Sequence, residues 1–233
     1  MNRVLIPLFA GALTCLILSG TAHARTAAAS GGLSPLPLSF VETSSSGGAE
    51  SGYQCRIPSC ALLFTREGMR MALGGRTAES DKTPLMLAVT FPGSRRNVVP
   101  RGEEACAWKS NFFIGDDPAK WRTGVTNYHR VRYAGLYDGV DLVYYGAKGS
   151  LKYDFVVKCG SDPSRIRIAY DAGGPGSVAL NGRGELVGKS HAGTLVEQNP
   201  YNYQIIDGVV LSRERSYAIV DEKNGKVAFD VGT

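Results

Sequence analysis

Beyond its N-terminal segment, the sequence has no long apolar run and no stretch of sustained helical periodicity. A membrane-spanning helix needs roughly 20 consecutive apolar residues, so we expect no transmembrane segment after residue 24. An amphipathic helix repeats its apolar positions every three to four residues. The lack of that pattern argues against a helix bundle and against layers of helices on a parallel sheet.

The chain is also poor in the residues that common hydrolases need. It has three histidines, of which only His129 and His191 follow residue 24, and it has no Gly-x-Ser-x-Gly motif. Nothing in the spacing composes a Ser-His-Asp triad. Gly188-Lys189-Ser190 resembles the end of a phosphate-binding loop, but that motif needs glycine where Arg183 stands, and it needs a following helix. We therefore expect no nucleotide site.

Charge of one sign is not concentrated anywhere. The formal net charge is +5, from 26 lysines and arginines against 21 acidic residues, and the basic residues are scattered along the chain. Nucleic-acid-binding proteins carry a basic stripe, often interleaved with aromatic residues. Its lack predicts that nucleic acid is not a partner.

The first 24 residues have the organisation of a secretory signal. Arg3 supplies a positive charge, residues 4–18 are largely apolar, and residues 21–24 (Thr-Ala-His-Ala) end in a small-x-small cleavage pattern. The alternative, a membrane anchor, needs a longer apolar run. We predict cleavage after Ala24, a disordered leader over residues 25–34, and a secreted, periplasmic or cell-surface location.

Four cysteines remain after the predicted cleavage: Cys55, Cys60, Cys106 and Cys159. An even number in an oxidising compartment favours disulfides. The leading hypothesis pairs Cys55 with Cys60 across a short loop, and Cys106 with Cys159, while other connectivities stay open. A zinc site is the weaker alternative, because no second close cysteine pair or nearby histidine completes it.

Short alternating runs separated by turn residues dominate the rest of the chain. Residues 85–91 and 151–157 each alternate apolar and other residues, as half-buried strands do. Asn181-Gly182, Asp207-Gly208 and Asn224-Gly225 are typical of tight hairpin turns. The sequence therefore predicts an all-β fold, an antiparallel sandwich-like structure.

Only short helical turns are expected, at Asp117-Pro118 and Asp162-Pro163, where an aspartate caps a turn that begins with proline. Charge and proline interrupt the strand pattern between residues 93 and 104. We therefore predict two lobes, an N-terminal β lobe over residues 35–92 and a β-rich lobe over residues 105–233. A Ser- and Gly-rich stretch, residues 43–52, is expected to be a mobile loop.

A series of motifs in fixed order resembles a known family. The series comprises residues 109–123 (Lys-Ser-Asn-Phe-Phe-Ile-Gly-Asp-Asp-Pro-Ala-Lys-Trp-Arg-Thr), residues 131–133, residues 136–146 (Leu-Tyr-Asp-Gly-Val-Asp-Leu-Val-Tyr-Tyr-Gly), residues 153–157 and residues 162–167. It is similar to the uncharacterised DUF7948-like domain that precedes SBBP β-propeller-like repeats in large bacterial cell-surface proteins. The resemblance implies export and an adhesive or envelope role, and it assigns no catalytic residues.

Asp141 and Asp154 are the best candidates for a site. If the hairpin turn centres on residues 147–148, Asp141 lies opposite Asp154 on the same side of the sheet. Like charges in that position repel, so a cation, a shared proton or an arginine should compensate. A carboxylate pair suits calcium binding or acid–base chemistry. The structural alternative is that the candidate arginine partners, Arg122, Arg130 and Arg132, clamp the carboxylates as ion pairs.

Aromatic residues offer a further site, a sugar-stacking platform, although aromatics in β proteins more often belong to the core. The platform would combine Tyr144, Tyr145, Tyr201, Tyr203, Trp108 and Trp121. Alternation lets only one of Tyr144 and Tyr145 face the core of a sandwich.

These features together predict an exported, non-enzymatic envelope or cell-surface module with a structural or adhesive role. Its expected partner is an envelope glycan or a surface protein, and no cofactor is expected apart from calcium as a candidate. The alternatives are a periplasmic hydrolase that uses Asp141 and Asp154, and a calcium- or glycan-binding module.

Overall fold

The computed structural model describes most of the chain from residue 38 to residue 171 and a set of shorter segments on either side. The described residues are 5–14, 38–43, 51–57, 60–73, 85–147, 150–171, 178–183, 185–190, 193–197, 201–206, 209–214, 217–221 and 226–229. The strands are β1 (Leu5–Thr14), β2 (Phe40–Thr43), β3 (Gly52–Ile57), β4 (Cys60–Thr65), β5 (Gly68–Leu73), β6 (Leu85–Thr90), β7 (Arg101–Phe112), β8 (Arg122–Tyr137), β9 (Val140–Ala147), β10 (Ser150–Lys158), β11 (Arg167–Asp171), β12 (Val178–Leu180), β13 (Leu186–Ser190), β14 (Gly193–Glu197), β15 (Tyr201–Ile206), β16 (Val209–Glu214), β17 (Tyr217–Asp221) and β18 (Lys226–Phe229).

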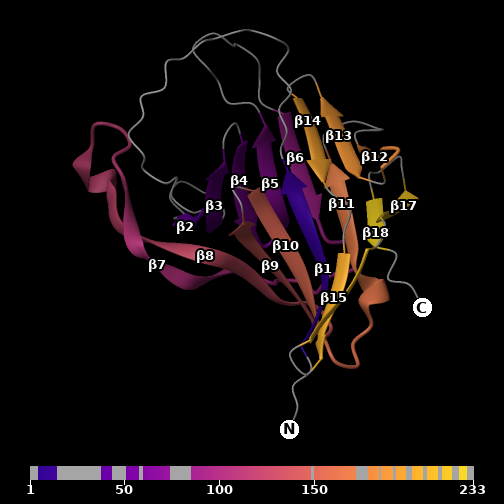
Figure 1. Ribbon diagram of the computed structural model, residues 1–233. Helices are drawn as coiled ribbons and strands as arrows, with labels where there is room; N and C mark the ends of the chain where they lie inside the picture. Colours follow the sequence, from indigo (N-terminus) through magenta and orange to yellow (C-terminus); the bar gives the residue numbers. More distant parts are fainter. Residues whose placement is uncertain are drawn as a thin grey trace, which may run out of the picture.

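The described strands form one curled antiparallel sheet, so the all-β prediction is confirmed. The long strand β8 belongs to both halves of the sheet. On one side the strands run in the order β7, β8, β9, β10, β1 and β15, and on the other side β8 continues through β2, β3, β4, β5, β6 and β11. The two halves lie one behind the other (Figure 1).

The two halves face each other across a single core. The rings of Phe64 on β4 and Tyr144 on β9 have centroids 4.8 Å apart, and Phe91 lies 6.4 Å from Phe155 on β10. Residues from both predicted lobes contribute to the same hydrophobic cluster, including Phe40 from the first and Tyr133 from the second. The strands predicted as separate lobes therefore share one interior.

The alternation in the sequence explains which side chains enter this core. Along β10, each residue that faces inward is buried, and the residues between them are half-buried. Leu87 and Val89 on β6 and Phe91 after it are buried in the same way. Both strands expected from alternation are confirmed, since side chains two residues apart point to the same face of a sheet.

The turns also follow their local sequence signals. Leu180 pairs with Leu186 across the turn at Asn181-Gly182, and the Asn181 side chain accepts hydrogen bonds from the backbone N–H groups of Arg183 and Glu185. Asp117 and Asp162 each cap a short 3-10 helix, η2 (Pro118–Lys120) and η3 (Pro163–Arg165). Among the described residues, no helix is long and apolar enough to cross a membrane.

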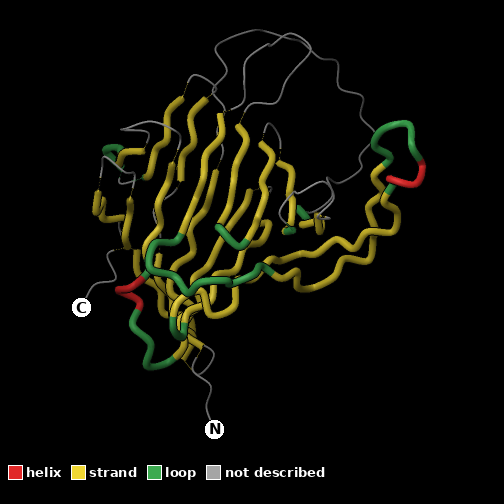
Figure 2. Tube along the Cα trace, turned by 180° about the vertical axis from the view of Figure 1, so that it is seen from behind, coloured by secondary structure: helices red, strands yellow, loops and turns green. Residues whose placement is uncertain are grey.

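The strands β7 and β8 leave the body of the sheet together as a long two-stranded arm (Figures 1 and 2). Their pairing extends from Arg101 opposite Arg132 to Phe112 opposite Arg122, with two register shifts along the way. Such bulges bend a strand pair and increase its local twist. The far end of the arm carries the turn that contains η2.

The N-terminal predictions fall mostly outside the described residues. The leader at residues 25–34 and residues 44–50 of the Ser- and Gly-rich stretch lie there. Within the predicted signal, residues 5–14 form β1, which pairs antiparallel with β10.

Candidate functional site

The register predicted for the β9–β10 hairpin is wrong by two residues. Ala147 pairs with Ser150, so Asp141 lies opposite Val156 and Asp154 lies opposite Val143. Because the shift is two residues, Asp141 and Asp154 still share the outer face of the sheet, but as diagonal neighbours rather than as a facing pair.

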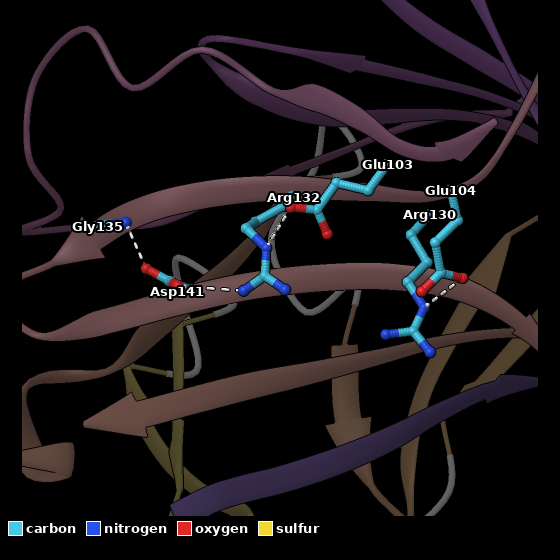
Figure 3. Close-up of polar contacts among 6 residues, drawn as sticks. All are labelled: Glu103, Glu104, Arg130, Arg132, Gly135 and Asp141. Carbon is cyan, nitrogen blue, oxygen red and sulfur yellow. Dashed lines mark hydrogen bonds and ion pairs between the residues drawn. The ribbon is translucent and has the colours of Figure 1, made fainter. Parts of the chain in front are cut away.

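Arg132 connects the predicted carboxylate Asp141 to a second acid, Glu103 (Figure 3). Its Nε donates to Glu103 Oε1 at 2.7 Å and its Nη1 donates to Asp141 Oδ2 at 3.1 Å. The side chain of Asp141 is only 16% exposed and that of Arg132 is 26% exposed. Burial lowers the pKa of Arg132, but its bonds and charge interactions with Glu103 and Asp141 raise it, and the net direction is upward.

The second oxygen of Asp141 is also occupied. The backbone N–H of Gly135 donates to Asp141 Oδ1 at 2.6 Å. Gly135 has a φ of +61°, in a part of β8 where the pairing with β9 shifts its register. Asp141 therefore holds an irregular point of β8 in place from the neighbouring strand.

The other three predicted residues have separate partners. Arg130 forms an ion pair with Glu104 at 3.2 Å, with both side chains about half exposed, and its guanidinium lies over the Tyr145 ring. Arg122 donates to the backbone carbonyl of Glu42 at 2.8 Å. Asp154 accepts a hydrogen bond from the Tyr145 hydroxyl at 3.2 Å.

The contacts of Asp141 are those of a structural carboxylate. Both oxygens of Asp141 accept structural hydrogen bonds, and Arg132 neutralises its charge. Within the described part of the chain, no three His, Cys, Asp or Glu residues are grouped so that they would hold a metal ion. The residues brought together here, Glu103, Arg132 and Asp141, form an ion-pair network across three strands.

The four cysteines are free thiols in the structure, so neither predicted disulfide is present in it. Cys55 lies opposite Leu62, two positions beyond Cys60, so these two buried residues are diagonal neighbours on one face. The diagonal spacing of about 7–8 Å between such positions is longer than a disulfide allows. Burial raises the pKa of the Cys55 thiol to about 12. Cys106 is buried on β7, and Cys159 is exposed after β10.

The predicted aromatic platform is not assembled among the described side chains. Tyr144 is buried in the core, while its neighbour Tyr145 is half-buried on the outer face, as alternation requires. Trp108 lies on the arm against His129, and Trp121 lies at the arm's far end. The side chains of Tyr201 and Tyr203 are outside the described set.

The tip of the arm carries the most exposed apolar cluster of the described residues. Ile114 is 74% exposed, Phe113 is 62% exposed and Trp121 is 40% exposed. The rings of Phe113 and Trp121 contact each other edge to face, with centroids 5.2 Å apart. We call Phe113, Ile114 and Trp121 the arm tip. Exposure of large apolar side chains to water is unfavourable, so a group of them at one exposed point is a candidate interaction surface.

Internal contacts hold the arm tip in one shape. The Trp121 indole N–H donates to the carbonyl of Gly115 at 3.0 Å, and Asp117 Oδ1 accepts from the backbone N–H of Ala119 at 3.0 Å. Gly115 has a φ of +75°, a conformation that glycine adopts without strain. These contacts restrict the conformations of the turn that carries the arm tip.

Sequence reasoning did not single out the arm tip. A signal was present, since residues 112–114 (Phe-Phe-Ile) are three consecutive large apolar residues. A half-buried strand can bury only alternate residues, so such a run directly before a turn predicts at least one exposed apolar side chain.

A buried acid in the core is a second feature that the sequence did not reveal. Glu197 on β14 is 1% exposed and accepts hydrogen bonds from the hydroxyls of Tyr153 and Tyr170, the latter at 2.6 Å. Burial, and after it the charge of Glu197, raises the pKa of Tyr170 well above its ordinary value. These groups lie among Met69, Met71 and Val89 in the interior, where their hydrogen bonds connect β10, β11 and β14.

The comparisons with known proteins identify the family without assigning an activity. No curated protein and no solved structure showed significant similarity to the chain. The profile of a domain of unknown function, DUF7948, matches residues 40–233, which is most of the sequence. The chain therefore belongs to the DUF7948 family.

Proposed function

We propose that the protein is an exported, non-enzymatic module of the bacterial cell surface or envelope that binds a partner protein through the arm tip. The observation that carries this proposal is the exposure of Phe113, Ile114 and Trp121 at the end of the projecting β7–β8 arm. Interfaces are enriched in aromatic residues, and their binding energy is concentrated in a few of them. The export signal predicted in residues 1–24 and the resemblance to SBBP-associated domains support the proposed location.

The chemistry of the arm tip favours a protein partner over a glycan. Sugar binding uses flat aromatic faces flanked by free hydrogen-bond donors, whereas Ile114 has no ring and the Trp121 indole N–H is bonded to Gly115. The edge-to-face contact between Phe113 and Trp121 produces a wedge rather than a platform. A wedge of this kind fits an apolar pocket on another protein.

The surroundings of Asp141 and Asp154 support a role without catalysis. A carboxyl group that acts as a general acid or base must bring one of its oxygens to the substrate to donate or accept a proton. Both oxygens of Asp141 are instead hydrogen-bonded, one to Arg132 and the other to Gly135. Asp154 lies on the same outer face with the Tyr145 hydroxyl as a partner. The hydrolase alternative is thus the weaker hypothesis.

Site-specific photo-crosslinking tests the proposal. A photo-reactive amino acid replaces Ile114 in the protein expressed at native levels in its own cells, and the same amino acid replaces Met86 as the control. Met86 is 54% exposed but lies on β6, away from the arm. We expect a defined protein adduct from position 114 that is missing from position 86.

Binding measurements with the purified partner then decide the energetics. Trp121→Ser should weaken binding by about 30-fold, because a central aromatic contributes about 2 kcal/mol or more. Met86→Ser should leave the affinity unchanged. Adducts with lipid alone, or equal affinity for both variants, would contradict a protein-binding arm tip.

A further inference from the structure

The strand β1 occupies a two-sided slot in the sheet. On one side it pairs antiparallel with β10 over eight positions, from Leu5 opposite Lys158 to Leu13 opposite Leu151. On the other side it pairs with β14 at Leu13 and Thr14 and with β15 at Leu8 and Ala10. Figure 1 shows β1 between β10 and β15.

The same ten residues belong to the predicted secretory signal. If export is followed by cleavage after Ala24, as the proposed function requires, β1 leaves the mature protein. The backbone of β10 then loses eight paired positions along one edge. An unpaired strand edge of this length presents N–H and C=O groups that readily pair with another chain.

We propose that the mature protein accepts an extended apolar segment of another exported protein in this slot. A segment that lies between two strands forms backbone hydrogen bonds on both sides, and side-chain pockets at alternate positions select its sequence. Filling the slot restores the pairing that β1 provides. This inference rests on the export part of the proposed function and not on the arm tip.

The two-sided geometry decides against a second copy as the occupant. A partner copy would offer its own β10 edge, but that strand is already paired with β9 in its sheet. A strand embedded in a sheet cannot enter between β10 and β15. The slot therefore requires a free, extended segment.

The register defines the chemistry of the segment. The inward-facing residues of β10, which are Leu151, Tyr153, Phe155 and Val157, are all buried. They lie opposite Leu13, Gly11, Leu8 and Ile6 respectively. The outer face of β10 carries Lys152 and Asp154, opposite the small residues Ala12 and Ala10. The expected segment has large aliphatic residues opposite Leu151, Phe155 and Val157, and small residues opposite Tyr153, Lys152 and Asp154.

The leader that follows the cleavage site does not meet this requirement. Residues 25–34 read Arg-Thr-Ala-Ala-Ala-Ser-Gly-Gly-Leu-Ser, with one large aliphatic residue among ten. A partner chain with alternating aliphatic residues is therefore the occupant that we infer.

Peptide binding to the mature protein tests this inference. The protein spanning residues 25–233 is mixed with a peptide of residues 5–14 that carries added C-terminal lysines for solubility. The control peptide has aspartate in place of Leu8 and Leu13, the positions opposite Phe155 and Leu151. Affinity is measured by calorimetry, and hydrogen exchange is followed along β10.

We expect the apolar peptide to bind one to one, to slow amide exchange within residues 151–158, and to bind at least tenfold more tightly than the control peptide. If the mature protein does not fold without β1, the full chain with a protease site after residue 24 is folded first and then cleaved. Retention of the cleaved segment, followed by its exchange for labelled peptide, supports the slot.

Two results would overturn the inference. One is protection of the β10 amides in the mature protein before any peptide is added, and the other is peptide binding that leaves those amides unprotected. Trp121→Ser should bind the peptide as the wild type does, so failure at the slot is distinguishable from failure at the arm tip.

Discussion

Asp141 is expected to be a structural residue whose removal costs far more stability than removal of Asp154. The Asp141→Ala variant loses the acceptor of the Gly135 N–H at 2.6 Å and the ion pair with Arg132 at 3.1 Å. The Asp154→Ala variant loses the hydrogen bond from the Tyr145 hydroxyl at 3.2 Å. The two aspartates differ in partners although they share one side of the sheet.

The contacts set the size of the difference. Hydrogen bonds to charged groups contribute about 1.5–3 kcal/mol each. The loss in Asp141→Ala is smaller than the sum of two such bonds, because Arg132 is partly exposed to water and still has Glu103 as an ion-pair partner. We therefore expect Asp141→Ala to lower the free energy of unfolding by about 2–3 kcal/mol and Asp154→Ala by about 1 kcal/mol or less. Asp141→Asn should fall between them, because an amide oxygen still accepts from Gly135.

Urea denaturation of the three variants, each with and without calcium, measures these values. A calcium or catalytic pair would behave differently, because the two aspartates would contribute jointly to ligand binding and calcium would raise the unfolding midpoint. Equal losses for Asp141→Ala and Asp154→Ala, or a calcium-dependent midpoint that both variants abolish, would refute the structural assignment.

Three further predictions follow from buried groups. Burial raises the pKa of Tyr137 from 10.0 to about 12. The contribution of this tyrosine to stability is therefore complete below pH 10 and is lost as the pH rises toward 12. Urea denaturation at a series of pH values should show that Tyr137→Phe makes the fall in the free energy of unfolding between pH 10 and pH 12 shallower. In the reduced protein, Cys159 should react with a thiol reagent at once, and Cys55 only on unfolding, because burial raises its pKa to about 12; simultaneous labelling would contradict the burial. Glu197→Ala removes the acceptor of two buried tyrosine hydroxyls and should lower the free energy of unfolding by about 2–4 kcal/mol. Glu197→Gln should lower it less, because the amide oxygen can still accept a hydrogen bond. Equal denaturation midpoints for the two variants would contradict this role of Glu197.

Much of the fold was predictable because alternation and turn chemistry are local. The buried faces of β6 and β10, the turn at Asn181-Gly182 and the caps at Asp117 and Asp162 all follow from residues within a few positions of one another. No long-range contact is needed to recognise them. The all-β class follows from their number.

The register of the β9–β10 hairpin was not predictable in the same way. A slip of one residue would exchange the buried and outer faces and would be visible in the apolar pattern. A slip of two residues keeps Tyr144 and Tyr153 on the buried face and Asp141 and Asp154 on the outer face. The apolar pattern is the same in both registers, and only the pairing of Ala147 with Ser150 in the structure distinguishes them.

The candidate sites depend on contacts between distant parts of the chain. The ion pair of Arg132 with Glu103 joins residues 29 positions apart, and Glu197 meets Tyr153 across 44 positions. The spacing of residues along the sequence does not predict contacts between such distant positions. The sequence suggested Arg122, Arg130 and Arg132 as equivalent partners of Asp141 and Asp154, and only the geometry assigns Arg132 to Asp141.

The arm tip and the β1 slot point to the same kind of role by different physics. The arm tip exposes apolar side chains that binding would bury, whereas the slot would expose backbone groups for pairing once β1 is removed. A side-chain wedge tolerates many partner sequences, but a two-sided strand slot fixes direction and register. A module with both surfaces gains specificity from the slot and additional contact area from the arm, and linked binding at two points exceeds either alone when the geometry allows both. One exported chain could supply both the pocket for Trp121 and the strand beside β10. In that case, removing either contact should reduce the affinity by more than the loss expected from the surface area buried at that contact alone.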